Sequence, residues 1–316
     1  MRCNPVLISL FALGLTACNG NGLPKVPDSG GGTPTPTLAP FVKFSSIAVP
    51  GTVRIIGSSQ EATYSFNTNT QLVTSLSAPT TFAGGVTFDA TYDVNGNLTK
   101  AVATSAIGTK VTVDTGIGDT ISSLAAFPNV TAMVTANGQN FSLSANPSAF
   151  GWDYQTFGVW TTASGTGFGT VGAATVGAET AIAAIPTSGT GVYVGVGGGR
   201  YADSNGVALF VGSDMTATTD FTARSIVFST TNTRTSPDLI TSTSNANLNL
   251  SGTLTYSVGT NQFTGAVTSV GGGPANAAMT GTSTGKFYGP AAQEIGGTFT
   301  VSNGNAGFIG AFGGKR

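Results

Sequence analysis

The sequence predicts an all-β protein, and composition, residue periodicity and turn residues all support this fold class. Glycine occurs 46 times, and charged residues make up only 8% of the chain. Glycine and β-branched residues disfavour helices, whereas valine, threonine, phenylalanine and tyrosine fit a pleated sheet. Apolar and polar residues alternate with a period of two in many segments, as half-buried strands require. The clearest examples are residues 62–66, 86–92 and 110–113.

Asn-Gly pairs predict hairpin turns, because these residues accept the left-handed backbone that a two-residue turn needs. Such pairs begin at Asn95, Asn137 and Asn205. Helical periodicity is weak throughout. We expect short helices only at residues 120–127 and 175–185, and residues 181–184 are the better helical segment.

The second half of the chain predicts eight or nine antiparallel strands with short connections, as in a roughly eight-stranded barrel. The expected strands are 190–197, 207–212, 216–221, 225–230, 248–257, 263–269, 282–288, 295–302 and 306–312. Strands of this length suit a closed up-and-down barrel, which leaves no strand edge exposed. Eight strands enclose a filled interior or a small cavity rather than a pore. A membrane porin is the competing barrel, but the sequence lacks its aromatic girdles.

The N-terminus predicts a lipoprotein signal peptide at residues 1–17. It has one positive charge and a short apolar stretch, and Leu15-Thr16-Ala17-Cys18 matches the lipobox pattern. Cleavage would leave Cys18 as an acylated first residue, held in membrane lipid by chains such as palmitate. The alternative is an ordinary cleaved signal with a chance cysteine. Asn19 follows where aspartate often signals retention in the inner membrane, so we expect the outer membrane.

Residues 18–40 are expected to form the lipid anchor and an unfolded tether. They are rich in glycine and proline and carry few large apolar side chains that could be buried. The remaining chain is long enough for one large or two medium domains.

The chain contains no histidine. This removes the usual general base, every Ser-His dyad and the commonest ligand of transition metals and haem. Cys3 would leave with the signal and Cys18 would be acylated, so no free thiol would remain. Asp89 and Asp93 are a close carboxylate pair, but the Asn95-Gly96 turn favours a structural role. We therefore expect no catalytic residue, metal or cofactor, and the net charge of −1 gives no footprint for nucleic acid.

Three local motifs each allow two interpretations. Residues 167–172 fit G-x-G-x-x-G, but without a strand-to-helix turn a glycine-rich loop is favoured over a dinucleotide site. Asp93 begins a segment similar to a calcium loop, but the required Gly and Glu are missing and a hairpin turn is favoured. The aromatic cluster with Trp152, Tyr154 and Trp160 is either core packing or an exposed ligand-binding surface.

Three stretches resemble the β-barrel domain of the transferrin-binding protein B family. They are WDYQTFGVW at 152–160, IPTSGTGVYVG at 185–195 and GKFYGPAAQEIGGTF at 285–299, and the FYGPAAQEIGGTF ending of the last is the most specific element. Members of this family are bacterial surface lipoproteins whose lobes pair a β-rich handle with an eight-stranded barrel. The resemblance implies that residues 41–186 are the handle and 187–316 the barrel. It also implies that Glu294 caps or pairs inside the barrel wall.

The resemblance implies a non-enzymatic surface lipoprotein of the outer membrane, built as a single lobe, that binds a protein or solute ligand. Iron or haem acquisition is the role it suggests, with a TonB-dependent receptor as a partner. Low charge and abundant serine, threonine and glycine fit a structural envelope protein or adhesin without a soluble ligand equally well. A hydrolase would need a pair of carboxylates in a cleft.

Overall fold

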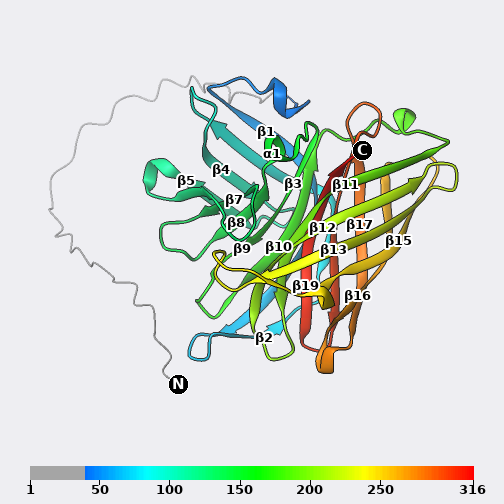
Figure 1. The fold of residues 1–316 in the computed structure, drawn as a ribbon. Helices are drawn as coiled ribbons and strands as arrows, with labels where there is room; N and C mark the ends of the chain where they lie inside the picture. The colour runs from blue at the N-terminus through cyan, green and yellow to red at the C-terminus, as the bar shows by residue number, and fades with distance from the viewer. Residues whose placement is uncertain (1–39) are drawn as a thin grey trace, which may run out of the picture. The chain divides into compact units, whose positions relative to one another are not determined.

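The computed structural model describes residues 40–316, which form two large antiparallel β-sheets (Figure 1). Strands β1 to β10 make up one sheet, which we call the first sheet. Strands β11 to β19 make up the other, which closes into the barrel. The predicted all-β fold class is confirmed. None of the helices within residues 40–316 combines the length and the hydrophobicity needed to span a bilayer.

The first sheet has ten strands in the order β5-β4-β3-β1-β10-β9-β8-β7-β6, and β2 pairs with β1 beside this path. The strands are β1 Gly51–Asn67, β2 Leu72–Leu76, β3 Thr80–Tyr92, β4 Leu98–Thr104, β5 Lys110–Asp114, β6 Thr120–Ser123, β7 Val130–Val134, β8 Phe141–Ala145, β9 Gln155–Thr161 and β10 Phe168–Gly177. The sheet curls so far that β5 contacts β6 and β8. One face of the sheet therefore encloses an interior.

Most of strand β10 and the middle of β1, residues 57–62, are buried on both faces. Successive side chains of a strand point to opposite faces. In β10, Val176 points into the interior of the first sheet, whereas Ala173 points toward the barrel. In β1, Ile55 and Tyr64 divide in the same way. Small residues are common in these strands because the barrel packs closely against one face.

The barrel consists of eight long strands, each antiparallel to its neighbours. They are β11 Thr190–Ala202, β12 Ala208–Asp220, β13 Ser225–Ser236, β15 Leu250–Tyr256, β16 Gln262–Gly272, β17 Ala278–Tyr288, β18 Glu294–Asn303 and β19 Ala306–Lys315. The two-residue strand β14, Thr243–Ser244, pairs with β13. Pairing of β11 with β19 joins the first strand to the last, and pairing of β12 with β13 completes the circle. The predicted closed up-and-down barrel is confirmed.

The barrel interior is filled by aromatic side chains. Its fully buried aromatic residues are Tyr193, Phe221, Phe228, Phe263, Phe287, Phe299 and Phe312. The Phe287 ring lies at the centre of this group, with four ring centroids between 5.4 and 6.1 Å from its own. The Tyr193 hydroxyl donates a hydrogen bond to the Ala292 carbonyl at 2.7 Å. The interior is therefore a packed core, as expected for eight strands.

The turn predictions were more accurate than the helix predictions. Each Asn-Gly pair lies in a hairpin turn, between β3 and β4, β7 and β8, and β11 and β12. The helix expected at 120–127 is wrong, because Thr120–Ser123 forms β6 and pairs with β7. Within 175–185, the first residues extend β10, and only Ile182–Ala184 forms a short 3-10 helix. Pairing with β1 and β9 outweighs the weak helical pattern at Thr175.

Residues 207–212 and 216–221, expected as separate strands, belong to one strand, β12. The pairing register with β13 shifts between Gly212 and Asp214, which marks a β-bulge. A bulge bends a strand without ending it. The polar pair Ser213-Asp214 was therefore a bend in the barrel wall and not a turn. The remaining helices are α1 Pro147–Phe150, η1 Phe44–Ser46, η2 Thr115–Ile117, η4 Ala246–Leu248 and η5 Pro274–Asn276.

Replacing Gly195 by alanine should weaken barrel closure. A Cβ atom at Gly195 would lie 2.0 Å from the backbone oxygen of Gly313, on the strand that β11 must pair with to close the barrel. We expect Gly195→Ala to lower the free energy of unfolding by about 3 kcal/mol, measured by denaturant titration. Gly84→Ala is the control, because a Cβ there meets nothing within 4 Å, and its effect should stay within about 0.5 kcal/mol. Equal stability of the two variants would contradict the close approach of β11 and β19.

Candidate functional site

A buried carboxylate joins the barrel to the first sheet. Glu294, the first residue of β18, is fully buried. Its Oε1 accepts a hydrogen bond from the Asp153 backbone N–H at 2.6 Å, and its Oε2 accepts from those of Tyr154 and Gln155 at 3.0 Å each. The backbone at the start of β9 thus binds a side chain that projects outward from the barrel wall, and this contact joins the barrel to the first sheet.

The pKa of the Glu294 carboxyl is raised above its usual value, and burial is the largest cause. The three N–H donors and the nearby Lys315 ammonium act in the opposite direction and favour the charged form. Lys315 is itself held by a hydrogen bond from Nζ to the Gly151 carbonyl, 2.7 Å away. An ionised carboxylate is an acceptor at both oxygens, which matches the three donors it faces. The contact is therefore specific to a carboxylate at this position.

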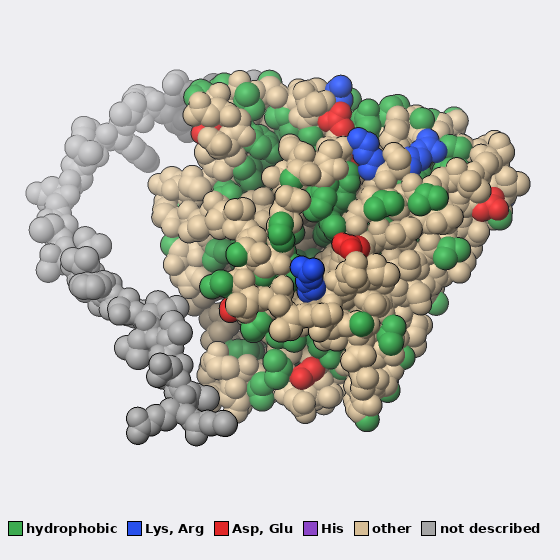
Figure 2. Space-filling model, viewed as in Figure 1, with side chains coloured by type: hydrophobic (Ala, Val, Ile, Leu, Met, Phe, Trp, Pro, Cys, Tyr) green, Lys and Arg blue, Asp and Glu red, His purple; other side chains and the backbone are tan. Residues whose placement is uncertain are grey.

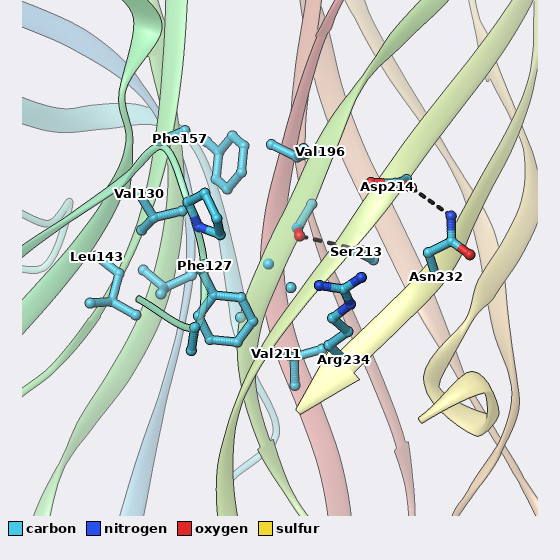
Figure 3. Close-up of a pocket in the computed structure, with 18 of the residues that line it drawn as sticks. Phe127, Val130, Leu143, Phe157, Val196, Val211, Ser213, Asp214, Asn232 and Arg234 are labelled. Carbon is cyan, nitrogen blue, oxygen red and sulfur yellow. Dashed lines mark hydrogen bonds between the residues drawn. The ribbon is translucent and has the colours of Figure 1, made fainter. Parts of the chain in front are cut away.

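A crevice of about 240 Å³ lies between the first sheet and the barrel wall (Figure 3). On the side of the first sheet it is lined by apolar residues, among them Phe127, Val130, Leu143 and Phe157. On the barrel side Val196 and Val211 flank a glycine floor at Gly197, Gly198 and Gly199. The Phe127 ring lies over Gly212, where a Cβ atom would come within 2.6 Å of it. Glycine at 212 therefore lets an aromatic residue of the first sheet approach the barrel wall.

Polar side chains gather on the barrel side of the crevice, as Figure 3 shows. The Asn232 amide donates a hydrogen bond to Asp214 Oδ2 at 2.7 Å, and the Ser213 hydroxyl donates to the Gly197 carbonyl at 3.4 Å. Arg234 is exposed and lines the same crevice. Within residues 40–316, the ion pairs are Arg54–Asp89, Lys100–Asp114 and Lys286–Glu179. Arg234 is thus available to a ligand that enters the crevice.

The predicted ligand-binding aromatic residues do not form one exposed surface. Trp152 and Trp160 are each only 4% exposed, and Tyr154 is half-buried. Trp152 stacks on Phe150, with ring centroids 4.7 Å apart, and belongs to the core between the first sheet and the barrel. Trp160 lies in the interior of the first sheet instead. The burial of both indoles favours packing, and their role in ligand binding stays a prediction.

The Asp93 segment, the Asp89 carboxylate and the glycine-rich residues 167–172 each have a structural role. The Asp93 carboxylate accepts N–H bonds from Asn95 and Asn97 within the turn, which hold the pKa of Asp93 below its usual value. Asp89 forms a paired salt bridge with Arg54, with both N–O distances 2.7 Å. The glycine-rich residues 167–172 lie at the start of β10, with no helix after them. Among residues 40–316 no three potential His, Cys, Asp or Glu ligands cluster to hold a metal. Cys18, the predicted lipidation site, lies outside the described residues.

The sequence analysis missed the polar residues of the crevice. Asp214, Asn232 and Arg234 come from β12 and β13, whose alternation pattern indicates only strands. The break expected between residues 212 and 216 was the one signal in the sequence, because it marks a bulge, and bulges often redirect side chains beside functional sites.

Residues 185–316 match the family described as the C-lobe and N-lobe β-barrels of Tf-binding protein B. This confirms the predicted resemblance, and the match spans all eight strands of the closed barrel. No curated protein matches the chain.

The chain is also similar to solved structures of transferrin-binding protein B. The Haemophilus parasuis structure shares 18% identity at a TM-score of 0.48, over 85% of this chain and 46% of that one. The Neisseria meningitidis serogroup B structure shares 18% identity at a TM-score of 0.42, over 81% of this chain and 43% of that one. The Actinobacillus pleuropneumoniae structure shares 12% identity at a TM-score of 0.44, over 82% of this chain and 99% of that one. The chain thus spans less than half of the first two proteins.

Replacing Glu294 by glutamine should loosen the contact between first sheet and barrel. A glutamine side chain has one acceptor oxygen and an NH₂ group, so at least one buried N–H of residues 153–155 would lose its acceptor. We expect Glu294→Gln to lower the free energy of unfolding by about 2 kcal/mol in denaturant titrations. Glu179→Gln removes only a partly exposed ion pair with Lys286, and it should cost less than about 1 kcal/mol. Similar losses in both variants would show that Glu294 has no special role.

Proposed function

We propose that this chain is a non-enzymatic surface lipoprotein of the outer membrane that binds a protein or solute ligand in iron or haem acquisition. The match of residues 185–316 to the barrels of Tf-binding protein B carries this proposal. Proteins of that name bind transferrin, an iron carrier, and this suggests the ligand class. The chain would act as a single lobe and pass its cargo to a TonB-dependent receptor.

In this proposal the chain is divided into four parts. Residues 1–17 are the signal peptide, and residues 18–40 are the acylated Cys18 and a tether. Residues 41–186 form a handle-like domain and residues 187–316 form the barrel. The change from the first sheet to the barrel supports the last boundary, because β10 ends at Gly177 and β11 begins at Thr190.

The crevice is the proposed contact site, because it combines apolar walls with a few polar groups that can orient a ligand. A volume of about 240 Å³ suits a small solute or one large side chain of a protein partner. Phe127 and Phe157 supply apolar contact, while Asp214 and Arg234 offer one charge of each sign. Trp152 would hold the position of Phe150, because the two rings stack and Phe150 lines the crevice.

A structural envelope protein or adhesin is the second candidate, and the surface of the barrel favours it. Outward-facing threonines and serines cover neighbouring strands, at Thr216, Thr218, Ser251, Thr253, Thr255, Thr264 and Thr268. Figure 2 shows how few Lys, Arg, Asp and Glu side chains lie on the face in view. Such an uncharged hydroxyl surface suits broad, weak contacts. Adhesion without any effect on iron supply would distinguish this candidate.

Reversing the charge of Arg234 should weaken ligand binding. The full chain is titrated with iron-loaded transferrin, haemoglobin and haem, and we expect at least one to bind. Arg234→Glu should then raise the Kd about tenfold, because a charge at the edge of a contact is reversed. Arg224→Glu, in the exposed turn between β12 and β13, is the matched control and should bind like the native chain.

Failure of all three probes would count against the proposed ligand class. A strain that lacks the gene for this chain gives the second measurement. If that strain also grew normally under iron limitation but adhered poorly to surfaces, adhesion would be the correct function.

Replacing Cys18 by serine should remove the membrane anchor. Serine has no thiol for acylation, so Cys18→Ser should incorporate no labelled palmitate and should leave the membrane fraction. The native chain should carry the label, and protease added to intact cells should degrade it if it faces outward. Equal labelling of both chains would refute lipidation at this position.

A further inference from the structure

Arg200 is a half-buried charged residue between the barrel and the first sheet. It lies near the end of β11, where the adjacent Tyr201 points into the barrel core. Successive side chains of a strand alternate, so Arg200 points outward to the surface that the first sheet covers. Its guanidinium carbon lies 3.8 Å from the Phe210 ring centroid and 5.6 Å from that of Phe141. Two aromatic residues, one from each sheet, thus pack around the cation.

The Arg200 guanidinium has no anionic partner within residues 40–316. It takes part in none of their ion pairs, and its buried Nη1 has no hydrogen-bond acceptor. Burial lowers the pKa of Arg200 to about 10, which leaves the group cationic at neutral pH. A buried charge is costly unless it is paired and hydrogen-bonded. Aromatic faces compensate for part of this cost but offer no acceptor to the N–H groups.

A second donor faces the same pocket. Arg200 lines a pocket of about 70 Å³, together with Thr161. The Thr161 hydroxyl is buried and also has no hydrogen-bond partner. The Tyr64 hydroxyl, another pocket residue, donates to the Thr162 carbonyl at 2.7 Å. Arg200 Nη1 and the Thr161 hydroxyl thus lie beside this pocket without a hydrogen-bond partner.

The rest of the pocket is mainly apolar, with Val73, Leu76, Val171 and Ile309 among its lining residues. Gly165, in the exposed turn between β9 and β10, also lines it and offers access from solvent. A volume of about 70 Å³ takes a carboxylate and the first carbons of its tail, and the opening at Gly165 lets the rest of a longer ligand extend into solvent. The pocket therefore suits a small anion with a short apolar tail. It shares no lining residue with the crevice.

We propose that this pocket binds a carboxylate, with Arg200 and Thr161 as the donors to its oxygens and a short aliphatic tail against the apolar wall. A guanidinium presents parallel N–H groups that match the two oxygens of a carboxylate. A free short-chain acid and the C-terminal carboxylate of a peptide share this chemistry. The apolar wall favours either of them over an inorganic anion. The site is separate from the crevice and does not depend on the ligand proposed there.

The test measures binding of small carboxylates to the full chain by calorimetry. The probes are sodium acetate, sodium butyrate and N-acetylalanine, with butyramide as the uncharged control and sodium phosphate as the inorganic anion. We expect butyrate or N-acetylalanine to bind, and butyramide and phosphate to bind at least tenfold more weakly. Whichever carboxylate binds more tightly identifies the source, a free acid or a peptide end. The bound probe should also raise the Tm of the chain in a concentration-dependent way.

Arg200→Met should abolish this binding, because methionine fills similar space without a charge. Its own Tm should be equal to or above that of the native chain, since a half-buried charge without an anionic partner has been removed. Arg224→Met is the matched control and should bind like the native chain. Arg200→Lys keeps the charge without the planar fork and should bind at least several-fold more weakly. Absence of binding by every carboxylate, or equal binding by the native chain and Arg200→Met, would overturn the proposal.

Discussion

The hydrogen bonds between the Glu294 carboxylate and the backbone of residues 153–155 hold the first sheet against the barrel. Both the crevice and the Arg200 pocket lie between these two sheets, on separate sets of residues. Their shapes therefore depend on how the sheets are docked. A buried carboxylate that accepts several N–H hydrogen bonds tolerates little change in position, because its backbone donors at the start of β9 have fixed directions. This explains why Glu294 stands in the most specific stretch of the barrel sequence.

The packed interior of the barrel decides where ligands can bind. Aromatic side chains fill much of the interior. The crevice and the Arg200 pocket both lie instead at the contact between the barrel and the first sheet. The two sites present their cations differently. Arg200 is half-buried and has no anionic partner within residues 40–316, whereas Arg234 is exposed and shares the crevice with Asp214.

The sequence predicted the barrel well and the sites poorly. Regular alternation and Asn-Gly turns are local signals, so strand positions and hairpins could be predicted from short windows. The helix expected at residues 120–127 was wrong because pairing with β7 is a non-local effect. Arg200 and Thr161 meet only because β11 and β9 lie on facing sheets, which no spacing in the sequence reveals. The aromatic cluster looked continuous along the chain, yet alternation sends Phe157 and Trp160 to opposite faces.

That division of the aromatic cluster has an optical consequence. The chain has two tryptophans, and neither belongs to the barrel. Trp152 lies where the sheets meet, whereas Trp160 lies in the interior of the first sheet. Trp152 shares its core with Ile309 and Ala311 of barrel strand β19, so its emission reports on the contact between the first sheet and the barrel. The core around Trp160 contains no barrel residue, so its emission reports on the first sheet. The protein thus carries a spectroscopic means of locating where a conformational change begins.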